Sequence, residues 1–208
     1  MRKYLITASA AALLIALPQF SPAQENASDT YRQLKLFSEV FERVRRLARA
    51  LSDLGVAPGE RVFFASTSEV YAGGVTAGVV PVPTPETVPT MISDITQPRF
   101  AYAVSKLLGE AAFLHTARAR GFETVIGRFH NVYGPRMGAD HVIPEMSLRA
   151  MRGVDPFPVP GADQYRAFCH VDDAVEAMLR LMDNPAAAGQ IVHIGNDSEE
   201  TSIGDLAK

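Results

Sequence analysis

An apolar run, Val62-Phe-Phe-Ala65, leads directly into the polar stretch Ser66-Thr-Ser-Glu-Val-Tyr71, and Tyr102-Ala-Val-Ser-Lys106 follows further along the chain. The aromatic and β-branched residues of the run predict a buried strand that ends near Ser66. The region around Tyr102 has the pattern of a helix, on which residues four positions apart share one face. A strand that ends in hydroxyl groups, followed by such a helix, predicts an α/β fold with a polar site between the two elements.

The residues of this predicted site have a definite chemistry. A free tyrosine has a pKa of about 10, and a cation within a few ångströms favours the phenolate and lowers that value. Lys106 could activate Tyr102 as a general base in this way, and Thr67 could hydrogen-bond the same substrate oxygen. A Tyr-x-x-x-Lys spacing also arises by chance on surface helices, so the motif alone leaves both interpretations open.

The remaining pattern alternates between strand and helix signals. Strands are predicted near 61–66, 123–129 and 190–194, and helices near 98–120, 140–152 and 171–183. Such alternation is typical of parallel sheets. The sequence therefore predicts an α/β fold, a partial Rossmann-like parallel sheet with flanking helices, preceded by a long amphipathic helix.

That helix and a linker occupy residues 24–60. Apolar residues recur at steps of three and four from Leu34 to Leu54, and Gly55 and Pro58 end the pattern. The opposite face carries four arginines; such a run could contact anionic lipid or nucleic acid, but we interpret it as a solvated helix face and assign it no partner.

Residues 1–23 resemble a secretory signal peptide. Arg2 and Lys3 precede an apolar core from Leu5 to Leu17, and Ser21-Pro-Ala23 offers small residues at a cleavage site. The core is too short for a stable membrane span. A buried or disordered N-terminal helix is the alternative interpretation.

Five segments, two of which include the stretches quoted above, carry a family resemblance that extends over about residues 62–208. They are Ala65-Ser-Thr-Ser-Glu-Val-Tyr71, Tyr102-Ala-Val-Ser-Lys-Leu-Leu-Gly-Glu110, Gly127-Arg-Phe-His-Asn-Val-Tyr-Gly-Pro-Arg136, Gly161-Ala-Asp-Gln-Tyr-Arg-Ala-Phe168 and His170-Val-Asp-Asp173. In this order and spacing, the chain resembles the extended short-chain dehydrogenase/reductase family, the NAD-dependent nucleotide-sugar epimerases, dehydratases and decarboxylases.

The resemblance implies a catalytic role for each of five residues. Tyr102 would take a proton from a sugar hydroxyl as hydride leaves for NAD, and Lys106 would lower its pKa and hold the cofactor ribose. Thr67 would orient the reacting hydroxyl. Ser68 and Glu69 lie where the dehydratase and decarboxylase branches keep acid/base or substrate-orienting groups. Glu69 could equally be a solvated loop carboxylate.

Four more residues would contact the ligands. The resemblance places Phe129 and His130 beside the nicotinamide, Asn131 beside the sugar nucleotide and Arg166 on its diphosphate, for which a guanidinium is well suited. His130 could instead be a hydrogen-bonded core histidine, Asn131 a turn former and Arg166 a surface charge.

The glycine-rich turn of a dinucleotide site is missing from the expected place. No G-x-x-G-x-x-G or G-x-G-x-x-G precedes Thr67, and Gly73, Gly74 and Gly78 follow it in what reads as a flexible loop. We therefore expect an incomplete domain whose sheet lacks a first βαβ unit. Its uncovered edge could promote homo-oligomerisation.

Two short segments resemble other families. Residues 1–45 are similar to the start of a carboxyl-terminal processing peptidase, and residues 46–62 to an opening segment of an adenylate-forming acyl ligase. Neither brings the catalytic motifs of its family.

The composition of the chain limits which kinds of ligand and cross-link we expect. The 208 residues are 47% hydrophobic with a net charge of −3, which gives no electrostatic argument for nucleic acid. The single cysteine, Cys169, excludes an internal disulfide, and no His/Cys/carboxylate spacing indicates a metal site.

Two functions follow as hypotheses. The first is an NAD-dependent epimerase, dehydratase or decarboxylase that acts on a nucleotide sugar. The second is a composite or remnant chain without tight NAD binding, at most a weak nucleotide-sugar binder. The family resemblance implies a cytoplasmic protein, whereas the signal-like segment favours export, and the sequence leaves both open.

Overall fold

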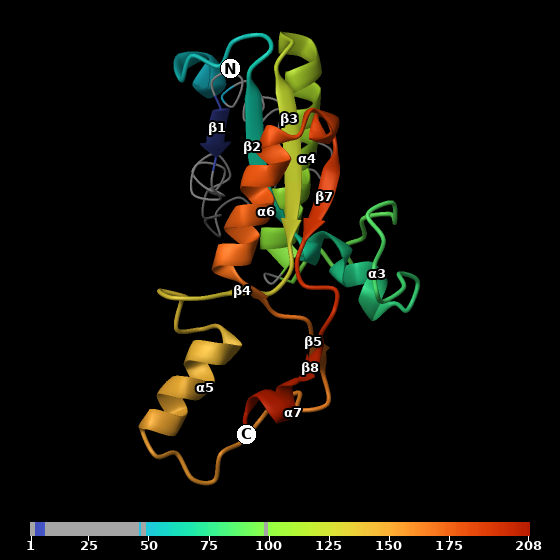
Figure 1. The fold of residues 1–208 in the computed structure, drawn as a ribbon. Coiled ribbons are helices and arrows are strands. Elements are labelled where there is room, and N and C mark those ends of the chain that lie inside the picture. Colours follow the sequence, from blue (N-terminus) through green and yellow to red (C-terminus); the bar gives the residue numbers. More distant parts are fainter. Residues whose placement is uncertain (1–2, 7–45, 47–48, 98–99) are drawn as a thin grey trace, which may run out of the picture.

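A parallel sheet forms the centre of the computed structural model, which describes residues 3–6, 46, 49–97 and 100–208 (Figure 1). Its strand order is β1-β2-β3-β7, and all three strand pairs are parallel. The strands are β1 (Lys3–Ile6), β2 (Arg61–Thr67), β3 (Glu123–Phe129) and β7 (Ile191–Ile194). The predicted α/β class and the three predicted strands are confirmed.

Two long helices cover the two faces of this sheet, α4 (Ala101–Arg120) and α6 (Val171–Asp183) (Figure 1). Alternate residues of β2 point to opposite faces, as the pleat of a strand requires. Val62 and Phe64 join the apolar cluster under α4, whereas Phe63 joins the cluster under α6. Each layer therefore buries one half of a strand that is apolar on both faces, which is typical of parallel sheets.

The outer edge of β2 is paired, which corrects the expectation of an uncovered strand edge. Lys3–Ile6 lies parallel to Arg61–Phe64, residue by residue. These four residues fall within the segment that reads as a signal peptide. Residues 7–45, which hold most of that segment and of the predicted amphipathic helix, lie outside the described residues. Of the helix, residues 49–53 are helical, and Leu51 is buried in the cluster under α4.

A smaller lobe lies beyond the carboxyl ends of β2, β3 and β7 and contains α5, α7 and the β5–β8 pair (Figure 1). The elements outside the sheet and its two covering helices are η2 (Ser68–Tyr71), α3 (Ala72–Thr76), β4 (Val132–Tyr133), α5 (Val142–Met151), β5 (Tyr165–Arg166), β6 (Cys169–His170), η4 (Pro185–Ala187), β8 (Thr201–Ser202) and α7 (Ile203–Leu206). No helix in the described part of the chain is long and apolar enough to cross a bilayer.

The glycine-dense segment after β2 is not the flexible loop that its composition suggests. Gly73 and Gly74 are buried in the short helix α3. A Cβ on Gly73 would lie 2.5 Å from the Met91 carbonyl oxygen, so this close approach of two backbones requires glycine. Tertiary packing has therefore overridden the local signal for a loop.

Candidate functional site

The candidate site lies where the carboxyl ends of β2, β3 and β7 meet the first turns of α4. Thr67 is the last residue of β2, Phe129 is the last of β3 and Ile194 the last of β7. Open α/β sheets bind their ligands at this edge because the loops that follow parallel strands gather there.

Thr67 and Tyr102 come together across this edge. Burial raises the pKa of the Tyr102 phenol, a hydrogen bond with Thr67 lowers it, and the charge of Glu69 raises it again. The net direction is upward, although half of the Tyr102 side chain is exposed. The phenol is therefore protonated at neutral pH in this arrangement. It forms a hydrogen bond with Thr67 and is also accessible to solvent.

Lys106 lies one turn further along α4 and is only 4% exposed. Its Nζ donates to the Ala65 carbonyl at 2.8 Å and lies 5.5 Å from the centroid of the Tyr102 ring. Burial lowers the pKa of Lys106. The sequence predicted that this ammonium lowers the pKa of Tyr102, but burial outweighs any such effect here and the pKa of Tyr102 is raised.

Ser68 and Glu69 form the first turn of the 3-10 helix η2, directly after Thr67. The Glu69 backbone N–H donates to the Thr67 hydroxyl at 3.3 Å, which caps this turn. The Glu69 side chain is exposed. Its carboxylate is nevertheless near enough to raise the pKa of the Tyr102 phenol. Glu69 is therefore both exposed to solvent and close to the site.

His130 directly follows β3, and its ring lies tilted against that of a second histidine, His193. The rings of His130 and His193 lie 4.6 Å apart, and the buried Nε2 of His130 has no hydrogen-bond partner among the described residues. Burial is the main cause that lowers the pKa of His130 to about 4, with a contribution from His193. One ring nitrogen of His130 thus has no partner among the described residues, and its role beside the nicotinamide stays a prediction. Phe129 packs edge-on against Phe63 in the cluster under α6.

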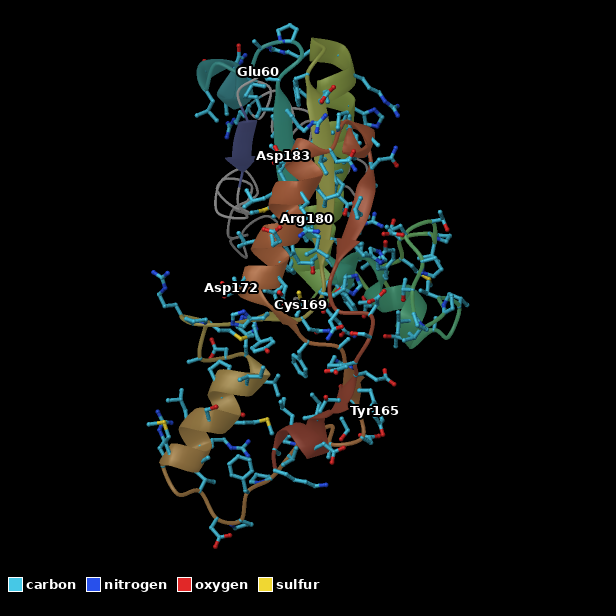
Figure 2. All side chains as sticks on the ribbon, viewed as in Figure 1. Glu60, Tyr165, Cys169, Asp172, Arg180 and Asp183 are labelled. Atoms are coloured by element: carbon cyan, nitrogen blue, oxygen red, sulfur yellow. The ribbon has the colours of Figure 1, made fainter. Side chains whose placement is uncertain are left out.

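Asn131 and Arg166 lie on the side of the smaller lobe. Asn131 has a left-handed backbone conformation with φ of 42°, and its side-chain amide donates to the Ala167 carbonyl at 3.2 Å. Asn131 thus forms a turn, and its side chain links this turn to the residues between β5 and β6. Arg166 is exposed and donates to the Gln164 side chain at 2.8 Å. Figure 2 shows its neighbour Tyr165 in the smaller lobe, away from the sheet.

A buried polar network behind the site was missed by the sequence analysis. Arg128 on β3 pairs with Glu110 on α4 through two parallel hydrogen bonds, Nε to Oε1 at 2.8 Å and Nη2 to Oε2 at 2.6 Å. Ser66 donates to the same Oε1, and Arg128 also donates to the Tyr71 hydroxyl. The Tyr71 hydroxyl in turn lies 2.8 Å from Nε2 of His193.

One sequence signal could have pointed to this network. Glu110 follows Lys106 by four positions and Tyr102 by eight, so all three share one face of α4. A carboxylate on the buried face of a helix needs a cation, because an unpaired charge is expensive to bury. The sequence does not say that the cation is Arg128, which lies on a different element.

The pKa of His130 predicts acid-sensitive stability. The folded-state pKa is about 4, below the usual value of about 6.5, so the unfolded chain takes up a proton first as the pH falls. Stability is therefore lost between about pH 6.5 and about pH 4. After a discount for partial exposure, we expect the wild type to lose about 1–2 kcal/mol more than His130→Phe between about pH 7 and pH 5.

Urea unfolding of both proteins at each pH measures this difference. His115→Gln, which changes an exposed histidine on α4, serves as the matched control and should keep the wild-type pH dependence. Equal pH dependence of the wild type and His130→Phe would contradict the prediction.

Comparison with known protein families gives one family match that spans most of the chain. The sequence model described as "NAD dependent epimerase/dehydratase family" matches residues 23–195. The matched region includes β2, α4, β3, α6 and β7, and with them every residue of the candidate site.

Individual relatives agree with this match. A UDP-N-acetyl-alpha-D-glucosaminuronate decarboxylase from Bacillus cytotoxicus is 32% identical over 180 residues, which are 85% of this chain and 52% of the relative. The solved UDP-glucose 4-epimerase of Thermotoga maritima, determined with UDP-glucose, is 27% identical with a TM-score of 0.63. That match covers 79% of this chain and 50% of the epimerase.

A third comparison supports the fold. The UDP-glucuronic acid 4-epimerase of Bacillus cereus, solved with UDP-glucuronic acid and NAD, has a TM-score of 0.62 at 22% identity. The match covers 80% of this chain and 48% of the epimerase. The chain thus spans about half the length of each of these relatives.

Proposed function

The chain belongs to the NAD-dependent epimerase/dehydratase family, and from this premise we propose that it acts on a nucleotide sugar by proton abstraction from a sugar hydroxyl. Tyr102 is the proposed base, Thr67 the group that orients the hydroxyl and Lys106 the cation that supports the base. Loss of this proton together with a hydride oxidises the sugar. Epimerisation, dehydration and decarboxylation can all begin from the oxidised sugar, and the proposal includes all three reactions.

One observation carries this proposal. The phenol of Tyr102 meets the hydroxyl of Thr67 at the carboxyl edge of the sheet, and a nearly fully buried ammonium, Lys106, lies behind them. A lysine that keeps its charge away from solvent is expensive for the fold, so its position beside the phenol supports a chemical role. A purely structural helix would gain more from an apolar residue there.

The residues divide the work of proton transfer. The Tyr102 phenol is protonated at rest, so it must first release its proton to solvent. The resulting phenolate then takes the proton of a sugar hydroxyl that lies between Tyr102 and Thr67, and the threonine hydroxyl holds the sugar oxygen. Lys106 stabilises that phenolate, because a cation within a few ångströms favours the charged form. The chemistry that NAD supplies when bound is the acceptance of a hydride from the same sugar carbon.

The residues present fit the nicotinamide and ribose end of NAD better than its pyrophosphate. Lys106 uses one N–H on the Ala65 carbonyl and has further donors for a ribose, and His130 presents a buried ring nitrogen with no partner among the described residues. The strand beside β2 is β1, but the segment that follows it, Thr7-Ala-Ser-Ala-Ala-Ala12, contains no glycine, and the first glycine of the chain is Gly55. Glycines are what allow a backbone to approach a pyrophosphate closely.

The substrate class follows from the relatives and from charge. The relatives named above are described with UDP sugars, two of them with an acidic sugar. We propose a UDP sugar for this chain, with Arg166 on the diphosphate and Asn131 on the sugar nucleotide. Ser68 and Glu69, next to Thr67, would then act on the sugar itself and favour the dehydratase or decarboxylase branch.

The test combines binding with turnover. Full-length protein is titrated with NAD by calorimetry, and then incubated with NAD and either UDP-glucuronic acid or UDP-glucose while the products are separated by chromatography. We expect NAD binding at or below millimolar concentration and conversion of at least one sugar. Absence of NAD binding at millimolar concentration would overturn the proposed enzyme.

The absence of any glycine before Gly55 favours a second candidate. In this alternative the chain binds a UDP sugar weakly and does not hold NAD tightly. Binding of UDP-glucuronic acid that is unchanged by millimolar NAD, together with no turnover, is the result expected for it.

A further inference from the structure

The segment that carries Thr67, Ser68 and Glu69 is tied down at both of its ends by one buried ion pair. On the amino-terminal side, the Ser66 hydroxyl donates to Glu110. On the carboxyl-terminal side, the Tyr71 hydroxyl accepts a hydrogen bond from Arg128. Between these two points lies the whole of the turn that follows β2.

The ion pair itself is almost free of solvent. The side chains of Arg128 and Glu110 are each 4% exposed, and they join β3 to α4 through two parallel hydrogen bonds. Burial alone would lower the pKa of Arg128, but the hydrogen bonds and charge of Glu110 raise it above its usual value. Such a bidentate pair fixes orientation as well as distance.

Glu110 also belongs to the helix face that carries the proposed base. Tyr102, Lys106 and Glu110 follow one another at four-residue steps along α4. The hydrogen bond from Ser66 to Glu110 therefore connects the helix that presents Tyr102 to the end of β2 that presents Thr67, and the ion pair joins β3 to the same carboxylate. A shift of Glu110 would change the separation of those two hydroxyl groups.

We propose that Arg128, Glu110, Ser66 and Tyr71 form a positioning network that holds the Thr67 hydroxyl against the Tyr102 phenol. None of the four touches the proposed substrate oxygen, so they act through Thr67 and Tyr102. The effect of this network on catalysis rests on the proposed function. Its effect on the distance between the Thr67 and Tyr102 hydroxyl groups does not.

The network extends to a second loop through His193. The Tyr71 hydroxyl accepts from Arg128 and shares a second hydrogen bond, at 2.8 Å, with Nε2 of His193. The backbone N–H of His193 donates to the Glu86 carboxylate at 3.1 Å. The loop that contains Glu86 is thereby linked to the same ion pair through His193.

The experiment removes one hydroxyl at a time from the network. In full-length protein, Ser66→Ala removes the contact to Glu110, and Tyr71→Phe removes the contacts to Arg128 and His193. The first readout is the titration of Tyr102, followed by NMR of protein labelled at the tyrosine ring carbons. The chain has 6 tyrosines, and the Tyr102 signal is identified by its loss in Tyr102→Phe.

We expect the pKa of Tyr102 to rise in both variants, because the hydrogen bond from Thr67 that lowers it is weakened. The second readout is steady-state kinetics with NAD and UDP-glucuronic acid or UDP-glucose. There kcat should fall about tenfold to a hundredfold while KM stays within about twofold of the wild type, as expected for misplaced groups that still bind substrate.

Thr124→Val is the matched control. Thr124 lies on β3 like Arg128 and is buried, and its hydroxyl has no hydrogen-bond partner among the described residues. This variant should leave both the Tyr102 titration and kcat unchanged. If Ser66→Ala and Tyr71→Phe behave like Thr124→Val, the positioning network is refuted.

The two readouts separate this inference from the proposed function. If the wild type turns over no sugar but the Tyr102 titration shifts in the variants, the network stands and the proposed enzyme fails. If the wild type is active and the titration does not shift, the network fails and the enzyme stands. Should Ser66→Ala fail to fold, Tyr71→Phe alone decides.

Discussion

Tyr102→Phe is expected to lower kcat for nucleotide-sugar conversion by about a thousandfold, which corresponds to about 4 kcal/mol of transition-state stabilisation. The reason is that phenylalanine keeps the ring but removes the group that takes the proton. The Thr67 hydroxyl cannot replace it, because an alcohol is a much weaker base than a phenolate. The affinity for the sugar nucleotide should change little, since the contacts proposed for Asn131 and Arg166 do not involve the Tyr102 hydroxyl.

Steady-state kinetics together with calorimetric titration of UDP-glucuronic acid measures both parts of this expectation. Tyr133→Phe is the matched control, because it removes a phenol hydroxyl from a ring that packs against Phe168 and His170. That control should keep kcat within about twofold of the wild type. A Tyr102→Phe protein with more than a tenth of the wild-type kcat would remove Tyr102 from the role of base.

Arg128→Met is expected to destabilise the fold by about 3–5 kcal/mol, because it leaves the Glu110 carboxylate buried without its cation. Two hydrogen bonds to Glu110 and one to Tyr71 are lost at the same time. Urea unfolding at neutral pH measures the change in the free energy of unfolding. A loss below about 1 kcal/mol would show that the pair is not essential to the fold.

Arg180→Met provides the matched comparison. Arg180 pairs with Glu176 at 2.7 Å on α6, but these side chains are 79% and 58% exposed. Figure 2 shows Arg180 on helix α6, which covers one face of the sheet. Solvent screens such a pair, so the expected loss is below about 0.5 kcal/mol. The double variant Glu110→Leu/Arg128→Met should be less destabilised than Arg128→Met alone, because it removes the unpaired charge.

Much of the sheet could be predicted from local pattern. The run 62–65 at the centre of β2 is apolar on both faces, and its burial by α4 on one side and α6 on the other follows from that composition. The helix from Ala101 to Arg120 ends at Gly121, whose left-handed conformation is a common helix stop. Such signals need only neighbours in sequence, which is why they are visible without a structure.

The candidate site was only partly visible in this way. Thr67, Tyr102 and Lys106 could be grouped because a strand end and a helix face have fixed geometry. The raised pKa of Tyr102 could not be foreseen, since it depends on how deeply the phenol is buried. The flexible loop predicted from Gly73 and Gly74 was wrong for the same reason, as packing against the backbone at Met91 makes that segment helical.

The pairing of Lys3–Ile6 with Arg61–Phe64 also depends on tertiary structure. A short apolar segment after two basic residues has the same local appearance whether it is an export signal or a sheet strand. Its partner lies more than fifty positions away along the chain, and no periodicity connects the two.

Local order in the chain was sufficient to predict an α/β fold, three of the four strands of its central sheet and the helices near 98–120, 140–152 and 171–183, and to group Thr67, Tyr102 and Lys106. The buried connection of Arg128 to Glu110, Ser66 and Tyr71 exists only in the folded molecule. Hydrogen bonds between elements distant in sequence are selected by burial, because a charged group removed from water must find its partner wherever the topology provides one.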